Sequence, residues 1–304
     1  MKGVLTRSPR KFASTTALLI GLISGLLAGM SPVFAQSASS SGKLLLTGGV
    51  SQIEGAAGGG LTPWAIIGGY ESEGQVGANL HDTYVKSDDY SPNTSGVMIG
   101  FGDRVELSIA HQTFDTRNAG AQLGLGEGYR FSQDIFGVKV KLMGNAVLDQ
   151  DMWLPQIAAG IQFKHNNNAN IIAAIGARSD TGTDFYVSAT KLLLAQSLLI
   201  NGTVRLTKAN QLGLLGFGGD LSDNYHPEFE TSIAYLLSKH IAAGVEYRTK
   251  PNNLGFAREQ DWYDAFVAWA PNKYVSLTAA YVQLGDIATI RDQHGIYLSA
   301  QLGF

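Results

Sequence analysis

The last segment of the sequence places the tightest limit on what this chain can fold into. From Ile296 onward the even positions are apolar, the odd positions are polar or small, and the chain ends on Phe304. Successive side chains of a β-strand point to opposite faces of a sheet, so this segment presents one apolar face and one polar face. A sheet of this kind meets an apolar medium on one side only.

The same alternation recurs along the chain, and its interruptions divide the sequence into about twelve strands. An even number puts both ends of a closed sheet on one side, and the shorter turns then also fall on that side. Short turns are expected near 102–103, 195–196, 238–239 and 271–273. Longer polar connections are expected near 87–92, 117–130, 166–182 (with a helix-like piece at 170–177), 209–225, 251–260 and 285–292. The expected strands are 74–86, 93–102, 104–117, 131–144, 151–164, 183–194, 197–208, 227–237, 240–250, 261–270, 273–284 and 293–304.

The pattern therefore predicts an all-β protein, an antiparallel transmembrane outer-membrane β-barrel. Charged residues are 15 % of the chain, against about 25 % in typical soluble domains, which favours a sheet facing lipid over a soluble β-sandwich, the alternative fold. Aromatic residues near the expected strand ends could form the two interfacial girdles of such a barrel: Tyr84, Tyr90, Phe185, Tyr225, Phe229, Tyr247, Tyr263, Trp269, Tyr274 and Tyr281.

The N-terminal residues have the features of an export signal. Basic residues precede an apolar stretch from Ala17 to Met30, and Val33-Phe34-Ala35 fits a signal-peptidase site with cleavage after Ala35. A retained membrane helix is the alternative, but that needs about 20 apolar residues. We therefore expect a cleaved signal peptide at 1–35, a Ser/Gly-rich segment at 36–61 and a barrel at 62–304 in the outer membrane.

The segment 36–61 is rich in glycine, including Gly55 and Gly58-Gly59-Gly60. A phosphate-binding loop is not indicated, because no Gly-Lys-Ser/Thr follows and no strand-loop-helix context is present. Glycine serves where the backbone passes close to other groups, so the segment could fold into the lumen as a plug. A loose periplasmic tail is the alternative.

Two motifs point to relatives. The alternation Leu298, Ala300, Leu302 and Phe304 resembles the terminal signal read by the outer-membrane assembly machinery. The stretches Lys43–Val50 and Gly55–Trp64, with Thr190–Leu193 and Lys208–Gly213, resemble an uncharacterised family of Gram-negative proteins, domain of unknown function 3034. The resemblance covers the mature chain and implies an outer-membrane barrel. It implies no activity and no functional residues.

Charged residues that share a face with polar residues are candidates for the lumen lining. Charge on the lipid face would cost about 2–4 kcal/mol at mid-depth, so these side chains should point inward. Both signs occur, which argues against a strongly ion-selective pore; pairing across the lumen, which holds a barrel rigid, is the alternative role. The candidates are Glu106, Lys139, Lys141, Lys164, Arg205, Glu228, Glu230, Glu246 and Arg248.

Residues for catalysis or metal binding are not indicated. None of the six histidines pairs at metal-ligand spacing, and His111 and His240, the conceivable bases of a hydrolase, have no Gly-x-Ser-x-Gly elbow to supply a nucleophile. The net charge of −3 gives no sign of nucleic-acid binding. We therefore expect no enzyme and no cofactor.

The leading hypothesis is a passive channel for a small polar or amphipathic solute. Twelve strands lie between the filled eight-stranded barrels and the open sixteen-stranded ones, so a narrow path is physically reasonable. A structural or envelope-polysaccharide-export barrel without pore activity is the second hypothesis, and an outer-membrane hydrolase is the third. The expected partners are membrane lipid, the assembly machinery and the solute.

Overall fold

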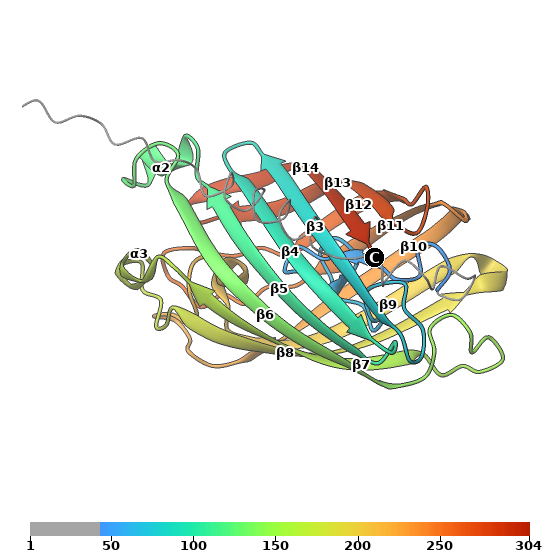
Figure 1. The fold of residues 1–304 in the computed structure, drawn as a ribbon. Coiled ribbons are helices and arrows are strands. Elements are labelled where there is room, and N and C mark those ends of the chain that lie inside the picture. The colour runs from blue at the N-terminus through green and yellow to red at the C-terminus, as the bar shows by residue number, and fades with distance from the viewer. Residues whose placement is uncertain (1–42) are drawn as a thin grey trace, which may run out of the picture. The chain divides into compact units, whose positions relative to one another are not determined.

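The computed structural model describes residues 43–304, and twelve strands of this part of the chain close into one antiparallel barrel (Figure 1). Each strand pairs with the next in sequence, and the last pairs with the first. The expected fold class is confirmed. The strands are β3 (Val76–Ser87), β4 (Ser91–Phe101), β5 (Val105–Asp115), β6 (Arg130–Met143), β7 (Gln156–Asn166), β8 (Thr181–Leu193), β9 (Leu198–Thr207), β10 (His226–Ser238), β11 (Ile241–Arg248), β12 (Trp262–Trp269), β13 (Val275–Ile287) and β14 (Ile290–Gly303).

Alternation along the strands separates an outer and an inner face. On β14, Leu298 and Leu302 are exposed, while Tyr297 and Gln301, each directly before one of them, are buried. The other strands repeat the pattern, so exposed Leu, Ile, Val and Phe side chains cover the outer wall. Most of the aromatic residues expected in girdles are also exposed. Tyr90 is the exception, because it is 1 % exposed and its hydroxyl donates inward to the carbonyl of Ile287 at 3.1 Å.

The connections at one end of the barrel, here called the loop end, include the longest ones, at 116–129, 167–180, 208–225 and 249–261. Two connections expected to be long are instead tight, at 88–90 and 288–289. The first is tight because β3 stays paired with β14, and β4 with β5, up to this turn; the second is tight because β13 and β14 pair up to Ile287 and Ile290. Short helices at the loop end are α2 (Ala119–Gln122), α3 (Ala169–Ala174) and the 3₁₀ turn η3 (Asn210–Gly213).

The opposite end, here called the terminal end, contains the start of β3 and the chain end at Phe304. Its turns are short, including the 3₁₀ turn η2 (Leu194–Gln196), except for residues 144–155 between β6 and β7. The strand predicted from residue 151 begins only at Gln156. Pro155 cannot donate to a sheet ladder, so the strand starts directly after it.

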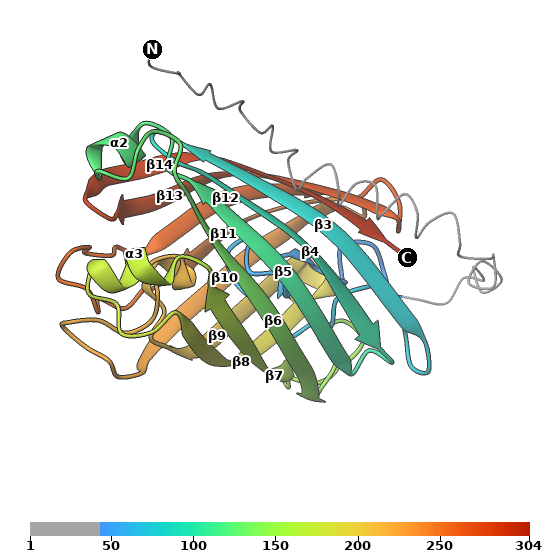
Figure 2. The same cartoon turned by 60° about the vertical axis from the view of Figure 1, so that its left-hand side comes forward.

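Residues 43–75 precede the barrel wall, and a two-stranded hairpin of β1 (Val50–Ser51) and β2 (Ala57–Gly58) forms among them. Nearly all side chains from Leu46 to Gly69 are buried. In Figure 2 this segment, drawn in blue, runs between the walls of the barrel. Residues 62–75 continue it, since the first wall strand begins at Val76.

The expected signal peptide and the residues up to 42 lie outside the described part of the chain. Within residues 43–304, no helix is long and apolar enough to cross a membrane.

Candidate functional site

The strongest feature of the lumen is a buried cluster of six charged groups around Glu54, which comes from the segment before the barrel. Arg248 donates to the Glu54 carboxylate at 2.6 Å, Lys164 also binds it, and the Arg205 guanidinium lies 3.5 Å from it. These three cations come from β11, β7 and β9. Glu54 therefore joins the N-terminal segment to three strands of the wall.

Two wall carboxylates complete the cluster. Asp184 on β8 lies 2.6 Å from Lys164 Nζ and 3.2 Å from Arg205 Nη1. Glu230 on β10 accepts from Arg205 Nε at 2.5 Å. With Glu54 present, three negative groups face three positive ones; without it, one wall cation has no counterion.

The cations control the ionisation of Glu54, whose side chain is fully buried. Burial alone would raise the pKa of this carboxyl, but Arg248, Lys164 and Arg205 hold the pKa well below its ordinary value. The carboxylate is thus charged across the physiological pH range. Removing one partner from a buried, hydrogen-bonded charge pair typically costs about 3–5 kcal/mol.

A second anchor holds the β1–β2 hairpin. Glu106 and Lys139 face each other on β5 and β6 and lie 3.0 Å apart. Glu106 accepts hydrogen bonds from the amides of Ala57 at 3.0 Å and Gly68 at 2.7 Å, and Lys139 donates to the carbonyls of Ala57 at 2.8 Å and Ile66 at 2.9 Å. This wall pair therefore satisfies backbone groups of the segment that would otherwise be buried without partners.

A third anchor holds residues 61–64. Glu246 on β11 accepts from the amide of Leu61 and the hydroxyl of Thr62, both at 2.7 Å. Ser232 on β10 lies 2.5 Å from the Thr62 hydroxyl and accepts from the Trp64 indole at 2.8 Å. All of these groups are buried.

Glycine is required where the segment folds back on itself. Gly55, directly after Glu54, has a φ of +91°, which side chains rarely adopt. A Cβ on Gly58 would lie 2.1 Å from the carbonyl oxygen of Thr62. The glycine-rich stretch thus lets a compact hairpin form inside the barrel, where neighbouring groups leave no room for larger side chains.

The structure places most of the predicted lumen residues in these anchors. Lys164, Arg205, Glu230 and Arg248 meet in the Glu54 cluster, Glu106 pairs with Lys139, and Glu246 binds Leu61 and Thr62. The other two lie apart. Lys141 binds Asp103 at the terminal end, and Glu228 binds the Thr249 hydroxyl at the loop end. Their role in solute passage stays a prediction.

Two members of the cluster were not among the predicted residues. Asp184 shares the inward alternation of β8, so that alternation could have indicated it. Glu54 is the only charged residue between Lys43 and Glu71, and an isolated charge in a glycine-rich apolar segment is the signal that could have found it. Its three partners come from distant strands and could not be predicted without the closed barrel.

A pocket with charged walls opens at the terminal end. Lys43 lies 2.8 Å from Asp103, and Lys141 binds the same carboxylate. Glu71 is buried beside them, 3.5 Å from Lys43 Nζ, with no hydrogen bond to either carboxyl oxygen from the described residues. Burial raises the pKa of Glu71 to about 7, although Lys43 opposes that rise.

A further group of polar side chains lies on the outer wall. His111 on β5 is exposed and lies 2.7 Å from Asp134 on β6 through Nδ1. Ser95 on β4 is the direct cross-strand partner of His111, and its hydroxyl donates to Asp82 at 2.5 Å. His240, the other base considered, instead contacts the carbonyl of Ala270 at a terminal-end turn. Within residues 43–304 no group of three or more His, Cys, Asp or Glu could hold a metal ion.

The predicted assembly residues lie on the outer face of β14 and, for Phe304, directly after its end. Leu298, Ala300, Leu302 and Phe304 are exposed, and Phe304 exchanges two backbone hydrogen bonds with Ala78 of β3, at 2.8 and 3.1 Å. The last residue therefore takes part in closing the barrel. Recognition by the assembly machinery stays a prediction.

Comparisons with known proteins find solved structures at low sequence identity. No curated protein matches the sequence. Among solved structures, the KdgM porin is 9 % identical with a TM-score of 0.48 over 74 % of this chain and 99 % of that one. An outer membrane channel from Pseudomonas putida is 9 % identical with a TM-score of 0.46, over 78 % of this chain and 97 % of that one. Outer membrane phospholipase A from Escherichia coli is 10 % identical with a TM-score of 0.40, over 74 % of this chain and 89 % of that one.

The sequence itself identifies a family. The profile described as "Protein of unknown function (DUF3034)" matches residues 47–301, which include both the segment within the lumen and nearly the whole wall. The suspected resemblance is confirmed, and the chain belongs to this family.

Proposed function

We propose that the protein is a passive outer-membrane channel for a small solute and that residues 43–69 form the plug that closes it. An apolar outer wall and a closed antiparallel sheet suit a barrel in lipid. The even number of strands would put both chain ends and the terminal-end pocket in the periplasm. The long connections of the loop end would then face outside.

The observation that carries this proposal is that the plug, rather than the wall alone, balances the lumen charges. In a purely structural barrel the wall cations would pair with wall carboxylates. Here Lys164 and Arg248 both bind Glu54, and both Glu106 and Glu246 bind backbone amides of the plug. These polar contacts are ones that water or a solute could replace, so the plug can leave without breaking the sheet.

Conductance in planar bilayers tests the proposal. The intact chain should give little or no current, and a variant lacking residues 43–69 should give steady, larger steps. A variant with Gly202→Ala is the matched control, because an added Cβ there meets nothing within 4 Å. If neither the intact nor the shortened chain conducts, the channel proposal fails, and a structural or polysaccharide-export role becomes the better account.

A hydrolase is the second candidate, and one observation favours it. His111 is paired with Asp134 at 2.7 Å and stands opposite Ser95, so three residue types of an acyl-transfer triad occupy neighbouring strands on the lipid-facing wall. The Ser95 hydroxyl contacts Asp82 rather than His111, so it would have to rotate to act.

Ester hydrolysis by the purified protein tests this second candidate. Activity on p-nitrophenyl esters that Ser95→Ala and His111→Ala both abolish, while Ser91→Ala does not, would support it. Activity that persists in the Ser95→Ala variant, or no activity at all, would exclude this site as a hydrolase.

A further inference from the structure

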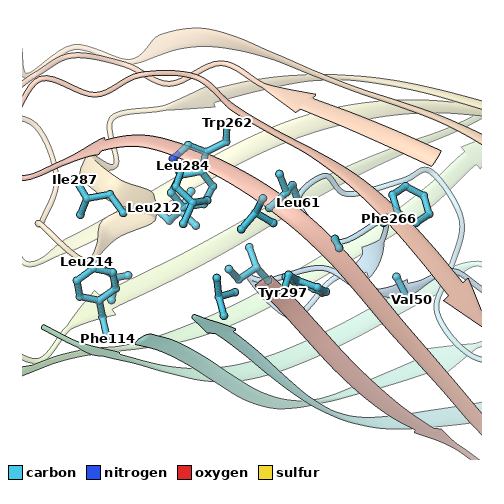
Figure 3. Packing of buried hydrophobic residues seen from close by; sticks show 14 of the residues in the cluster. Val50, Leu61, Phe114, Leu212, Leu214, Trp262, Phe266, Leu284, Ile287 and Tyr297 are labelled. Carbon is cyan, nitrogen blue, oxygen red and sulfur yellow. The ribbon is translucent and has the colours of Figure 1, made fainter. Parts of the chain in front are cut away.

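The loop-end half of the lumen contains a cluster of apolar side chains, although the lumen of an open pore for polar solutes is usually polar. Figure 3 shows Phe114, Leu212, Leu214, Trp262 and Ile287 gathered there. They come from two wall strands, the loop around η3 and the end of β13. All are buried.

Two cavities lie in this half. The outer cavity, about 90 Å³, lies beneath the loops and is lined by residues that include Tyr90, Phe131, Leu215 and Phe256. The inner cavity, about 20 Å³, lies between the η3 loop and the plug. Phe114 and Ile287 line both, so the two cavities adjoin.

No charged side chain lines either cavity. The pocket at the terminal end is the opposite case, since Lys43, Glu71, Asp103, Arg104 and Lys141 all line it. Apolar cavities stay dry and take apolar guests, whereas a polar solute would lose its hydration there without gaining hydrogen bonds.

One polar group in the inner cavity has no partner. The indole N–H of Trp262 is buried and makes no hydrogen bond to any described residue, while Lys250 Nζ lies over the ring, 4.2 Å from its centre. A buried donor without an acceptor destabilises the folded chain. A guest with one acceptor atom would remove that destabilisation.

The floor of the inner cavity belongs to the plug. Ile53 and Leu61 line it, and they flank the anchors at Glu54 and Thr62. A cavity of about 150 Å³ is needed to hold a benzene-sized guest, so such a guest would have to displace the η3 loop or these two plug residues. Binding would thereby act on the closed state of the channel.

From this geometry we infer, on the basis of the proposed channel function, that the solute is a small apolar molecule with a single hydrogen-bond acceptor, such as an aromatic ketone. It enters from the loop end through the outer cavity and meets Trp262 in the inner one. The plug below carries the apolar floor that the solute displaces.

Calorimetric titration of the full chain in amphipol tests this inference with three probes: acetophenone, ethylbenzene and glucose. Acetophenone should bind more tightly than ethylbenzene, and glucose should not bind. Trp262→Phe should weaken acetophenone binding about 3- to 10-fold and leave ethylbenzene unchanged, because only the donor is lost. Trp269→Phe, on the outer wall, is the matched control and should change neither.

A cavity-filling change, Ile175→Trp, should weaken the binding of both aromatic probes. The inference is overturned if neither aromatic probe binds, if glucose binds instead, or if Trp262→Phe and Trp269→Phe behave alike. Conductance by the plug-free chain together with absent aromatic binding would overturn only this inference. If the aromatic probes bind but neither the intact chain nor the plug-free chain conducts, only the channel proposal is overturned.

Discussion

The two ends of the lumen differ in what holds them together. At the terminal end, Lys43, Glu71, Asp103 and Lys141 form a charged group around an open pocket. At the loop end, apolar side chains enclose two cavities that no charged group lines. The proposed plug lies between these regions, with Glu54 bound by wall cations and Ile53 facing the apolar cavity.

This difference assigns two tasks to two regions: the apolar region selects the guest, and the charged region holds the plug in place. An apolar region selects a guest by desolvation and shape and is insensitive to pH and salt. Charged anchors fix a segment in one place, and they release it when one partner is lost. Changes in the charged region should therefore respond to pH or open the channel, while changes in the apolar region should alter binding and packing.

The largest effect is expected for Glu54→Gln. Three buried cations would then face only two carboxylates, which should cost about 3–5 kcal/mol of plug docking. Hydrogen–deuterium exchange of residues 43–69 should rise strongly. Glu73→Gln, at an exposed position shortly after these residues, is the control. Unchanged exchange in Glu54→Gln would show that the ion cluster does not hold the plug.

The terminal end should be sensitive to pH through Glu71. The pKa of its carboxyl is about 7 in the folded chain against an ordinary 4.5, so folding favours the protonated form. This contribution is present below pH 4.5 and is lost as pH rises through 7, for a total of about 3 kcal/mol. The free energy of unfolding, measured with urea between pH 4 and 8, should show this decline in the wild type and in the control variant Glu73→Gln.

Glu71→Gln should flatten that decline, since the amide does not titrate. A decline of the same size in Glu71→Gln would assign the pH dependence to another group.

The loop end should show a smaller effect without pH dependence. Ile287→Ala removes apolar contacts and enlarges the space that both cavities share, and should cost about 2 kcal/mol. That value lies near the low end for such changes, because the side chain already borders empty space. Urea unfolding at pH 5 and pH 8 should give the same loss, and a loss confined to one pH would break the contrast between the two ends.

The smallest effect is expected for Asp264→Asn on β12. Neither carboxyl oxygen of this buried residue has a hydrogen-bond partner among the described residues, and Glu246 is its direct cross-strand neighbour. Two buried carboxyl groups opposite each other can ionise together only against their mutual repulsion, and the amide removes this constraint, so it should stabilise the chain by about 1 kcal/mol. A marked loss of stability in thermal unfolding would instead mean that the carboxyl has a partner.

Much of the wall could be predicted from the sequence, because lipid and lumen impose a period of two on every strand. Glu106, Lys139 and Glu246 could be placed inward for the same reason. The misplaced start of β7 shows the limit, since the predicted strand included Pro155 while the ladder begins only after it. Tyr90 shows another limit of prediction, because an aromatic residue at a turn can face either the lipid or the lumen.

The arrangement inside the wall could not be predicted in the same way. Glu54, Lys164, Arg205 and Arg248 meet only because closure of twelve strands brings β7, β9 and β11 around one point. The apolar cavities likewise depend on the η3 loop turning inward, where Gln211 and Leu212 adopt left-handed backbone angles. Periodicity carries no information on such contacts.

A reversible disulfide tests the central claim, that the plug closes the lumen, most directly. The Thr62 and Ser232 hydroxyls lie 2.5 Å apart, and the chain has no cysteine of its own, so Thr62→Cys with Ser232→Cys gives one possible bond. Combined with Glu54→Gln, this chain should be closed in planar bilayers when oxidised and should conduct after reduction, reversibly. Equal current in both states would contradict the account.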